Sequence, residues 1–255
     1  MLSIAERHKY ILETLNKEGF VKVSDIAKDL DVTTVTVRKD LKLLEEKGLL
    51  YRTHGSASPV NPHMGDRTVT EKEKIRIEEK RKIGLAASKL IIANDSIIVN
   101  SGSTICAFAD QLKMDTPLMV VTASIKVTNI LSEYENINIW QLGGLYRRSS
   151  MSVVSNYSIR FLEEIACSKL FLGVDGIDPF FGVTTSNLEE AALNKAMMNV
   201  ALKTIVLCDS SKFGKRGFGK ICDLDKIDTI ITDSEISKSM KKHIEEQGVE
   251  LIIAE

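Results

Sequence analysis

The sequence predicts an α/β protein in two parts: a winged helix-turn-helix domain over residues 1–57 and a larger, doubly wound, mostly parallel α/β domain over residues 74–255. A linker over residues 58–73 joins them. Two observations carry this prediction. The N-terminal part contains several successive helical patterns, each preceded by a capping residue, and ends in a short strand and a turn. The rest of the chain places short apolar runs between helical segments.

The composition is that of an ordinary globular protein, with 44% hydrophobic and 27% charged residues. We find no signal-peptide pattern and no apolar run long enough to span a bilayer, so we expect a cytoplasmic protein without a membrane partner. The four cysteines form no CxxC pair, which predicts free thiols and no metal site. The net charge of −1 is weak evidence against nucleic-acid binding, because a small basic face can hide within such a total.

The second and third helices have the spacing of a helix-turn-helix. Ser3 and Glu6 form a capping box for the first helix, and Ser24 is expected to cap the second. Ala27 is small enough for two helices to cross closely. Asp31 falls in the tight turn that follows, where a left-handed backbone is needed and Asp tolerates it better than most residues.

The third helix has the pattern of a DNA-recognition helix. Thr33 is a good N-cap, and Val37, Leu41 and Leu44 fall on one buried face. The other face carries the hydroxyls, methyl group and cations that suit a major groove. Its members are Thr34, Val35, Thr36, Arg38, Lys39 and Lys42. The alternative is an amphipathic surface helix with a solvated charged face.

A wing is predicted directly after this helix. Gly48 ends the helix, and a short alternating strand leads to a turn at Gly55. Arg52 and His54 would lie on the wing and contact the DNA backbone or minor groove. Beyond the linker, a helix is expected to begin at Thr70, with Glu73 at its cap. Its charge run holds almost as many acids as bases, so a solvated helix is favoured over a basic arm for phosphates.

The larger domain is predicted from apolar runs without polar alternation, which indicate a buried parallel sheet covered on both faces. The runs cover residues 96–100, 118–122, 137–142, 169–174, 204–208, 229–232 and 249–254. Ligands in such sheets bind at the carboxyl ends of the strands.

The loops after these strands are polar in a consistent way. Backbone N–H groups with hydroxyls and Lys suit a phosphate, and hydroxyls with carboxylates suit a polyol, so together they predict a phosphorylated sugar as effector. The candidate residues are Ser101, Gly102, Ser103, Thr104, Thr122, Ser124, Gly143, Gly144, Asp175, Asp178, Thr184, Thr185, Lys195, Asp209 and Lys212. Neither a GxGxxG nor a GxxxxGK[ST] pattern occurs, so we expect no nucleotide cofactor.

Motifs along almost the whole chain resemble the DeoR family of bacterial transcriptional regulators. They are VTTVTVRKDLKLLEEKGLLYRTHGSA, SGST, QLGG, FLGVDGID, GVTT, DSSKFG and IDTIITD, in the family's order. The sequence departs from the family at three positions. Lys39 stands where a second Arg is usual, Ser56 where the wing has a second Gly, and Ala123 where the pocket often has Asn.

The resemblance implies a repressor of a sugar-utilisation operon that binds double-stranded operator DNA and responds to a sugar phosphate. It implies a homodimer or homotetramer, and a C-terminal fold like ribose-5-phosphate isomerase and glucosamine-6-phosphate deaminase. The stretches TVTVRKDL, GGLYRRSSMS and LFLGVDGID look closest to the branch that regulates N-acetylgalactosamine and galactosamine use.

Two other readings remain open. One is an isomerase or deaminase of sugar phosphates with an accessory DNA-binding head, in which Asp175 and Asp178 would be general acid and base. The other makes the winged helix a protein-interaction module rather than a DNA-binding one.

Overall fold

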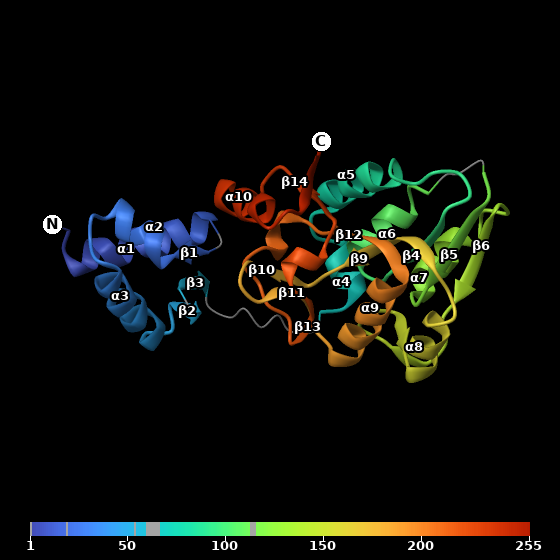
Figure 1. The fold of residues 1–255 in the computed structure, drawn as a ribbon, viewed down its shortest axis with the longest axis horizontal. Helices are drawn as coiled ribbons and strands as arrows, with labels where there is room; N and C mark the ends of the chain where they lie inside the picture. The colour runs from blue at the N-terminus through green and yellow to red at the C-terminus, as the bar shows by residue number, and fades with distance from the viewer. Residues whose placement is uncertain (1, 19, 54, 60–66, 113–115) are drawn as a thin grey trace.

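The computed structural model describes residues 2–18, 20–53, 55–59, 67–112 and 116–255. Figure 1 shows a small N-terminal domain, which we call the head (residues 2–59), at one end of the long axis. The larger domain, which we call the body (residues 67–255), occupies the rest. Within the described ranges, no helix is long and apolar enough to cross a membrane.

The head is a winged helix-turn-helix domain, as predicted. Its elements are α1 (Ile4–Glu18), β1 (Val21–Lys22), α2 (Val23–Asp29), α3 (Thr34–Glu46), β2 (Leu50–Thr53) and β3 (Ser56–Pro59). The predicted caps on α1 and α3 are present: Glu6 N donates to Ser3 Oγ, and Thr36 N donates to Thr33 Oγ1. Asp31 has φ of 51°, the left-handed conformation expected in the turn between α2 and α3.

The predicted cap of α2 is wrong. The helix begins at Val23, and the Ser24 hydroxyl donates to its neighbour Asp25 instead of capping. Val23 N donates to Gly55 O at 2.9 Å, so the wing accepts from a donor at the start of the helix. β3 pairs with both β1 and β2, which ties the wing to this point.

The single helix expected from Thr70 is also wrong. The chain forms two helices, α4 (Val69–Glu73) and α5 (Ile77–Ser88). Thr68 caps α4 in a capping box with Glu71. Arg76 lies between the helices with φ of 55°, and this left-handed residue separates one helix from the next.

The body is built on the seven predicted strands, which form one parallel sheet. They are β4 (Ser96–Val99), β5 (Leu118–Thr122), β6 (Ile137–Gln141), β9 (Cys167–Gly173), β12 (Ala201–Leu207), β14 (Thr229–Asp233) and β15 (Glu250–Ala254). Their order across the sheet is β15-β14-β12-β9-β4-β5-β6. The chain winds outward from β4 in one direction and from β9 in the other, which confirms the doubly wound class.

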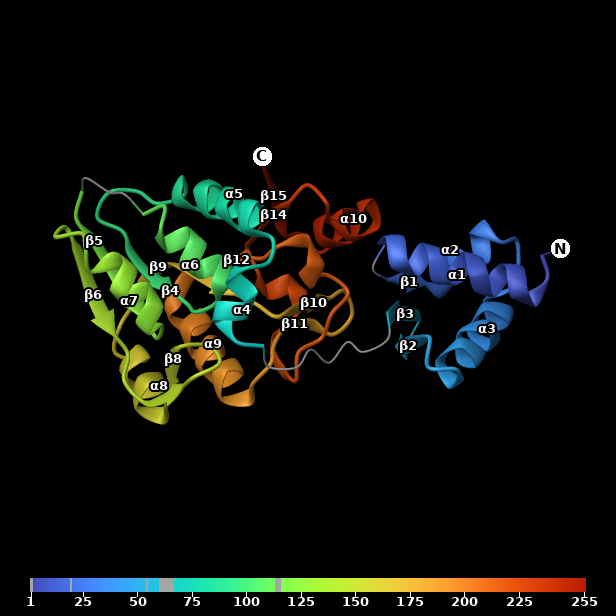
Figure 2. The same ribbon diagram turned by 180° about the vertical axis from the view of Figure 1, so that it is seen from behind.

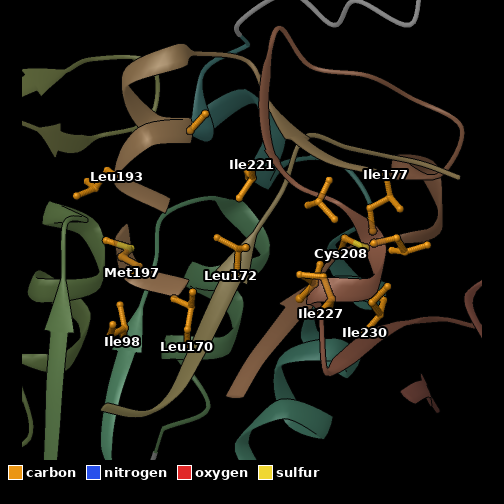
Figure 3. Close-up of a cluster of buried hydrophobic side chains, with 14 of the residues drawn as sticks. Ile98, Leu170, Leu172, Ile177, Leu193, Met197, Cys208, Ile221, Ile227 and Ile230 are labelled. Carbon is orange, nitrogen blue, oxygen red and sulfur yellow. The ribbon is translucent and has the colours of Figure 1, made fainter. Parts of the chain in front are cut away.

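Helices cover both faces of this sheet. α5, α6 (Ser103–Ala109) and α7 (Ile125–Leu131) contribute to one apolar cluster, and α8 (Asn156–Leu162), α9 (Leu188–Val200) and α10 (Lys238–Glu246) to the other. Successive strand residues alternate between the clusters. Figure 3 shows part of the second: Ile98, Leu170 and Leu172 lie beside Leu193 and Met197 of α9.

Two smaller antiparallel sheets and two 3₁₀ turns complete the body. They comprise β7 (Leu145–Arg147), β8 (Ser152–Val154), β10 (Gly176–Asp178), β11 (Gly182–Thr185), β13 (Gly219–Cys222), η1 (Ser210–Lys212) and η2 (Leu224–Lys226). β11 pairs with both β10 and β13. Figures 1 and 2 both place β10, β11 and α10 at the end of the body nearest the head.

Candidate functional site

The outward face of α3 presents the predicted DNA-reading set. Exposed on it are Thr34, Val35, Arg38, Lys39 and Lys42. Thr36 is half-buried, and its hydroxyl lies 3.0 Å from that of Thr33. The opposite face is in the core, with Val37, Leu41 and Leu44 each at most 1% exposed. The helix therefore offers hydroxyls, a methyl-bearing side chain and three cations to a groove.

The recognition helix is fixed to α1 by a buried ion pair that the sequence did not suggest. Arg7 binds Asp40 through two bonds, Nε to Oδ2 at 2.7 Å and Nη2 to Oδ1 at 2.9 Å. His8 Nε2 lies 3.3 Å from the same carboxylate. Asp40 is 3% exposed, so this buried bidentate pair fixes α3 against α1.

The wing cation is held by the recognition helix. Arg52 Nε donates to Glu45 Oε2 at 2.7 Å, and Arg52 N donates to Oε1 at 2.9 Å. Burial opposes ionisation of Glu45, but the hydrogen bonds from Arg52 outweigh it and lower the pKa of the carboxyl. Arg52 therefore braces the wing against α3. His54, also predicted on the wing, lies outside the described residues.

A polar cavity lies in the body where the loops after β4 and β9 meet. These adjacent strands are where the chain reverses its direction of winding, and ligands bind α/β sheets at such a point. Seven predicted effector residues line this cavity: Ser101, Gly102, Ser103, Thr104, Asp175, Thr185 and Lys212. Its volume is about 50 Å³.

The other predicted effector residues do not line the cavity. They are Thr122, Ser124, Gly143, Gly144, Asp178, Thr184, Lys195 and Asp209. Several of them shape the loops instead. Ser124 caps α7, and Asp209 caps the η1 turn that carries Lys212. Thr184 donates to Gly176 O and accepts from Gly217 N. Lys195 lines a different surface hollow.

The carboxylate of Asp178 is bound by groups outside the cavity. Arg216 binds its carboxylate at 2.8 and 3.0 Å, and the N–H groups of Phe180 and Phe181 donate to it. With 2% exposure, Asp178 fixes a turn rather than facing the cavity. The pairing of Asp175 with Asp178 as general acid and base is therefore not assembled by the fold.

An ion pair crosses the cavity. Lys72 Nζ donates to Asp175 Oδ1 at 2.7 Å, and Asp175 Oδ2 accepts from Ser186 N and Thr185 Oγ1. Burial acts to raise the pKa of Asp175, but Lys72, Lys212 and the hydrogen bond from Ser186 N lower it below its ordinary value. A carboxylate held ionised in this way is able to accept further hydrogen bonds from a polyol.

A second carboxylate lies in the same cavity and was missed by sequence reasoning. Glu190, in the first turn of α9, accepts from Arg147 Nε at 3.1 Å and is 8% exposed. Asn194 lies one turn later and accepts from Asn100 Nδ2 at 2.8 Å. These side chains give the cavity one region of carboxylate and amide groups.

The segment that follows the linker forms a wall of the cavity, which sequence reasoning also missed. Arg67, Val69 and Lys72 line it. Val69 N donates to Ser149 O at 2.6 Å. The buried Lys80 donates to the carbonyls of Lys72 and Ile75 at the end of α4. The charge run expected to be solvated therefore bonds partly within itself, and through Lys72 to the rest of the body.

Comparison with known proteins agrees with both halves of this arrangement. Residues 7–62 match the family described as the DeoR-like helix-turn-helix domain. Residues 75–234 match the DeoR C terminal sensor domain. The chain belongs to the DeoR family. It is therefore a DNA-binding transcriptional regulator that carries a DeoR-type sensor domain.

Relatives match over nearly the full length. A putative aga operon transcriptional repressor from Escherichia coli O157:H7 is 35% identical over 98% of this chain and 93% of its own. The lactose phosphotransferase system repressor of Staphylococcus epidermidis is 32% identical over 93% and 95%. The repressor GlcR of Bacillus subtilis strain 168 is 31% identical over 98% and 96%.

Among solved structures, ribose 5-phosphate isomerase A from Neisseria gonorrhoeae is similar to part of this chain. The identity is 20%, the match covers 52% of each chain and the TM-score is 0.40. So partial a match assigns no activity to this DeoR-family chain.

The three departures from the DeoR family pattern fall in different surroundings. Lys39 is exposed on α3, where an ammonium replaces a planar guanidinium. Ser56 is buried in the wing strand β3, and Ala123 is buried beside the end of β5 without lining the cavity. Only the first is on a surface that could read DNA directly.

Proposed function

We propose that this DeoR-family protein is a repressor of a sugar-utilisation operon, released or retained on its operator according to the occupancy of the body's cavity by a phosphorylated sugar. The observation that carries the proposal is the cavity itself. It combines cations, hydroxyls and carboxylates at the switch point of the sheet, in the same chain as a DNA-reading head.

The charges of the cavity suit a phosphate monoester. Arg67, Lys72 and Lys212 line it, against the two carboxylates Asp175 and Glu190. Each carboxylate has a cation partner, Lys72 for Asp175 and Arg147 for Glu190. An added dianion, with a charge of about −2 near neutral pH, therefore meets an excess of positive charge. The carboxylates then accept hydrogen bonds from sugar hydroxyls.

Lys72 competes with a ligand for Asp175. Its ammonium already donates to Asp175 Oδ1 at 2.7 Å. A sugar hydroxyl that takes the place of Lys72 Nζ frees the ammonium for the phosphate. Ligand entry would then be an exchange of partners at Asp175.

We propose a binding role without turnover. Of the two carboxylates required by the alternative isomerase reading, Asp175 lines the cavity but Asp178 is held by Arg216 and the turn N–H groups. Aldose–ketose interconversion of candidate sugar phosphates by the purified protein tests this. Turnover that is abolished by Asp175→Asn would contradict a pure sensor.

The head's proposed partner is double-stranded operator DNA in the cytoplasm. A homodimer or homotetramer would set two α3 helices about 34 Å apart, one turn of duplex, or a multiple of it. Salt-insensitive or absent binding to DNA upstream of the regulated genes would instead favour a protein-interaction role for the head.

The deciding experiment is an operator-binding assay with a panel of phosphorylated sugars. We place galactosamine 6-phosphate and N-acetylgalactosamine 6-phosphate first, because of the sequence resemblance and the aga operon relative, with ribose 5-phosphate and inorganic phosphate for comparison. One sugar phosphate is expected to change operator affinity while inorganic phosphate has little effect. No response to any of them would reject phosphate-sugar sensing.

Lys212→Ala tests the cavity within the same assay. Operator affinity without effector should stay within about twofold of the wild type, because the residue lies in the body far from α3. The response to the active sugar phosphate should be blunted. Lys74→Ala, which removes an exposed cation beside α4, is the matched control. A full response in Lys212→Ala would remove Lys212 from the binding site.

A further inference from the structure

The head touches the body through one aromatic cluster. Phe20 follows α1, yet it is 4% exposed and packs with the body's apolar cluster. Its ring lies 6.2 Å from that of Phe180, edge to face, and 6.2 Å from that of His243 on α10. Phe180 and His243 are 5.8 Å apart, so the three rings close on one another.

Polar bonds hold the same contact. Ser237 Oγ and Ser239 Oγ, both at the start of α10, donate to the carbonyl and the carboxylate of Glu18 at 3.0 and 2.9 Å. His243 Nε2 donates to Pro179 O at 2.9 Å, because a carbonyl can only accept. α10 is thus bonded on one side to the head and on the other to the turn that carries Phe180.

That turn is the far end of a hairpin whose near end lies in the cavity. β10 begins directly after Asp175, and β11 ends at Thr185, which also lines the cavity. The turn between them holds Pro179 and Phe180. Three residues of strand span roughly 10 Å, so the cavity and the aromatic cluster are the two ends of one short element.

The hairpin has little freedom to bend between its ends. A Cβ at Gly176 would come within 2.3 Å of Lys215 O, and one at Gly182 within 2.2 Å of Cys222 O. Backbone this closely packed moves as a unit with its neighbours. Asp178 pins the turn through Arg216, as described above.

We propose that the β10–β11 hairpin transmits the binding of an effector at Asp175 to the head. Phe180 and His243 act as positioning residues, because their rings contact Phe20 of the head. The inference rests on the proposed function for the identity of the signal. When a ligand displaces Lys72 from Asp175, the base of the hairpin changes its partner, and the docked position of the head changes with it. Coupling of this kind requires two arrangements of the head that the ligand binds unequally.

Phe180→Ala is the variant that tests the proposal. Phe180 is 43% exposed, so its truncation removes the ring contacts to Phe20 and His243 without opening a sealed core. Phe180→Tyr keeps the ring and should restore wild-type behaviour. Tyr157→Ala, an equally drastic loss from α8 where the side chain is 81% exposed, is the control. Ser239→Asp is a second, independent variant, because it sets a carboxylate against that of Glu18.

Two quantities are measured on the full-length protein: operator affinity, and the ratio of operator affinities with and without N-acetylgalactosamine 6-phosphate or whichever panel sugar is active. Calorimetric titration gives the sugar's own affinity. Phe180→Ala and Ser239→Asp should bring this ratio at least about threefold closer to 1, whichever way the sugar shifts it, while the sugar still binds. A purely structural role in the body would instead weaken sugar binding. Ratios equal to that of Tyr157→Ala in both variants overturn the proposal.

Failure of the proposed function has a different signature. If the wild type responds to no sugar phosphate, the proposed function fails. Operator affinity measured without effector then tests the contact between the head and the body by itself. A shift of operator affinity by about threefold or more in both variants, absent in Phe180→Tyr and Tyr157→Ala, supports head docking through this cluster. Unchanged operator affinity in both rejects it.

Discussion

At the scale of single residues, the head depends on one buried charge pair. Asp40 is on the inward face of α3, among Val37, Leu41 and Leu44, where an apolar residue would be expected from the period. Arg7 on α1 donates to both oxygens of its carboxylate. A pair of this kind adds little over apolar packing, but removal of one partner leaves the other buried and uncompensated.

Asp40→Ala should therefore destabilise the head by about 3–5 kcal/mol. Thermal or urea unfolding, followed by circular dichroism of the helix-rich head, measures the change. Glu46→Ala is the control, because this exposed carboxylate forms only a 3.8 Å pair with Lys42 and its loss should stay within about 0.5 kcal/mol. Equal stability of the two variants would show that the Arg7 pair does not organise α3.

At the scale of elements, α3 separates its two tasks by face. The buried stripe fixes the helix, and Glu45 near its end braces the wing through Arg52. The exposed stripe carries the residues proposed to contact DNA. Since no exposed member contributes to the core, its substitution should change binding without changing folding.

Arg38→Ala should weaken operator binding by about 1–3 kcal/mol and relax sequence preference at the base it reads. An electrophoretic or fluorescence assay across single-base operator variants measures both. Lys9→Ala, which removes an exposed cation from α1, is the matched control and should leave sequence preference intact. Uniform weakening across all operators would assign Arg38 to a phosphate instead of a base.

Helices and strands could be predicted where the sequence pattern that marks them lies within the element or directly beside it. The seven strands stood out as buried apolar runs, and Thr33 and Asp31 marked α3 and the turn before it. Short strands such as β10 carry too few residues for any period to register. Arg67 and Lys72 were missed as cavity residues because no strand of the body precedes their segment. Its Lys72 pairs with Asp175, more than 100 positions along the chain. Glu190, in the first turn of α9, was not among the predicted residues.

Loop polarity predicted the site only in part, for a physical reason. Residues at strand ends must also cap helices and close turns. Ser124, Asp178 and Asp209 do so, and their side chains are occupied with backbone N–H groups. A sequence shows that an Asp follows a strand but not which donor it faces.

At the scale of the whole molecule, ligand binding and folding are linked. A sugar phosphate that binds only the folded body should stabilise it by about 2.7 kcal/mol at one hundred times its Kd. Scanning calorimetry with and without the active sugar measures the shift in Tm. Lys212→Ala should lose most of it, and Lys74→Ala should retain it. A shift of equal size in Lys212→Ala would place the ligand elsewhere.

The wall formed by Arg67 and Lys72 lies in the gap between the segments that match the two DeoR-family domains, 7–62 and 75–234. This has a consequence for anyone who recombines such regulators. A chimera joined at residue 75 would import a foreign wall together with the foreign head, and its sugar response would belong to neither parent. A crossover placed before Arg67 keeps the pocket whole. Even then, a grafted head without an aromatic ring in the place of Phe20 would find no match for Phe180 and His243. Exchange of heads between relatives is therefore limited both by the wall, which lies between the two matched segments, and by the residue at position 20 inside the head.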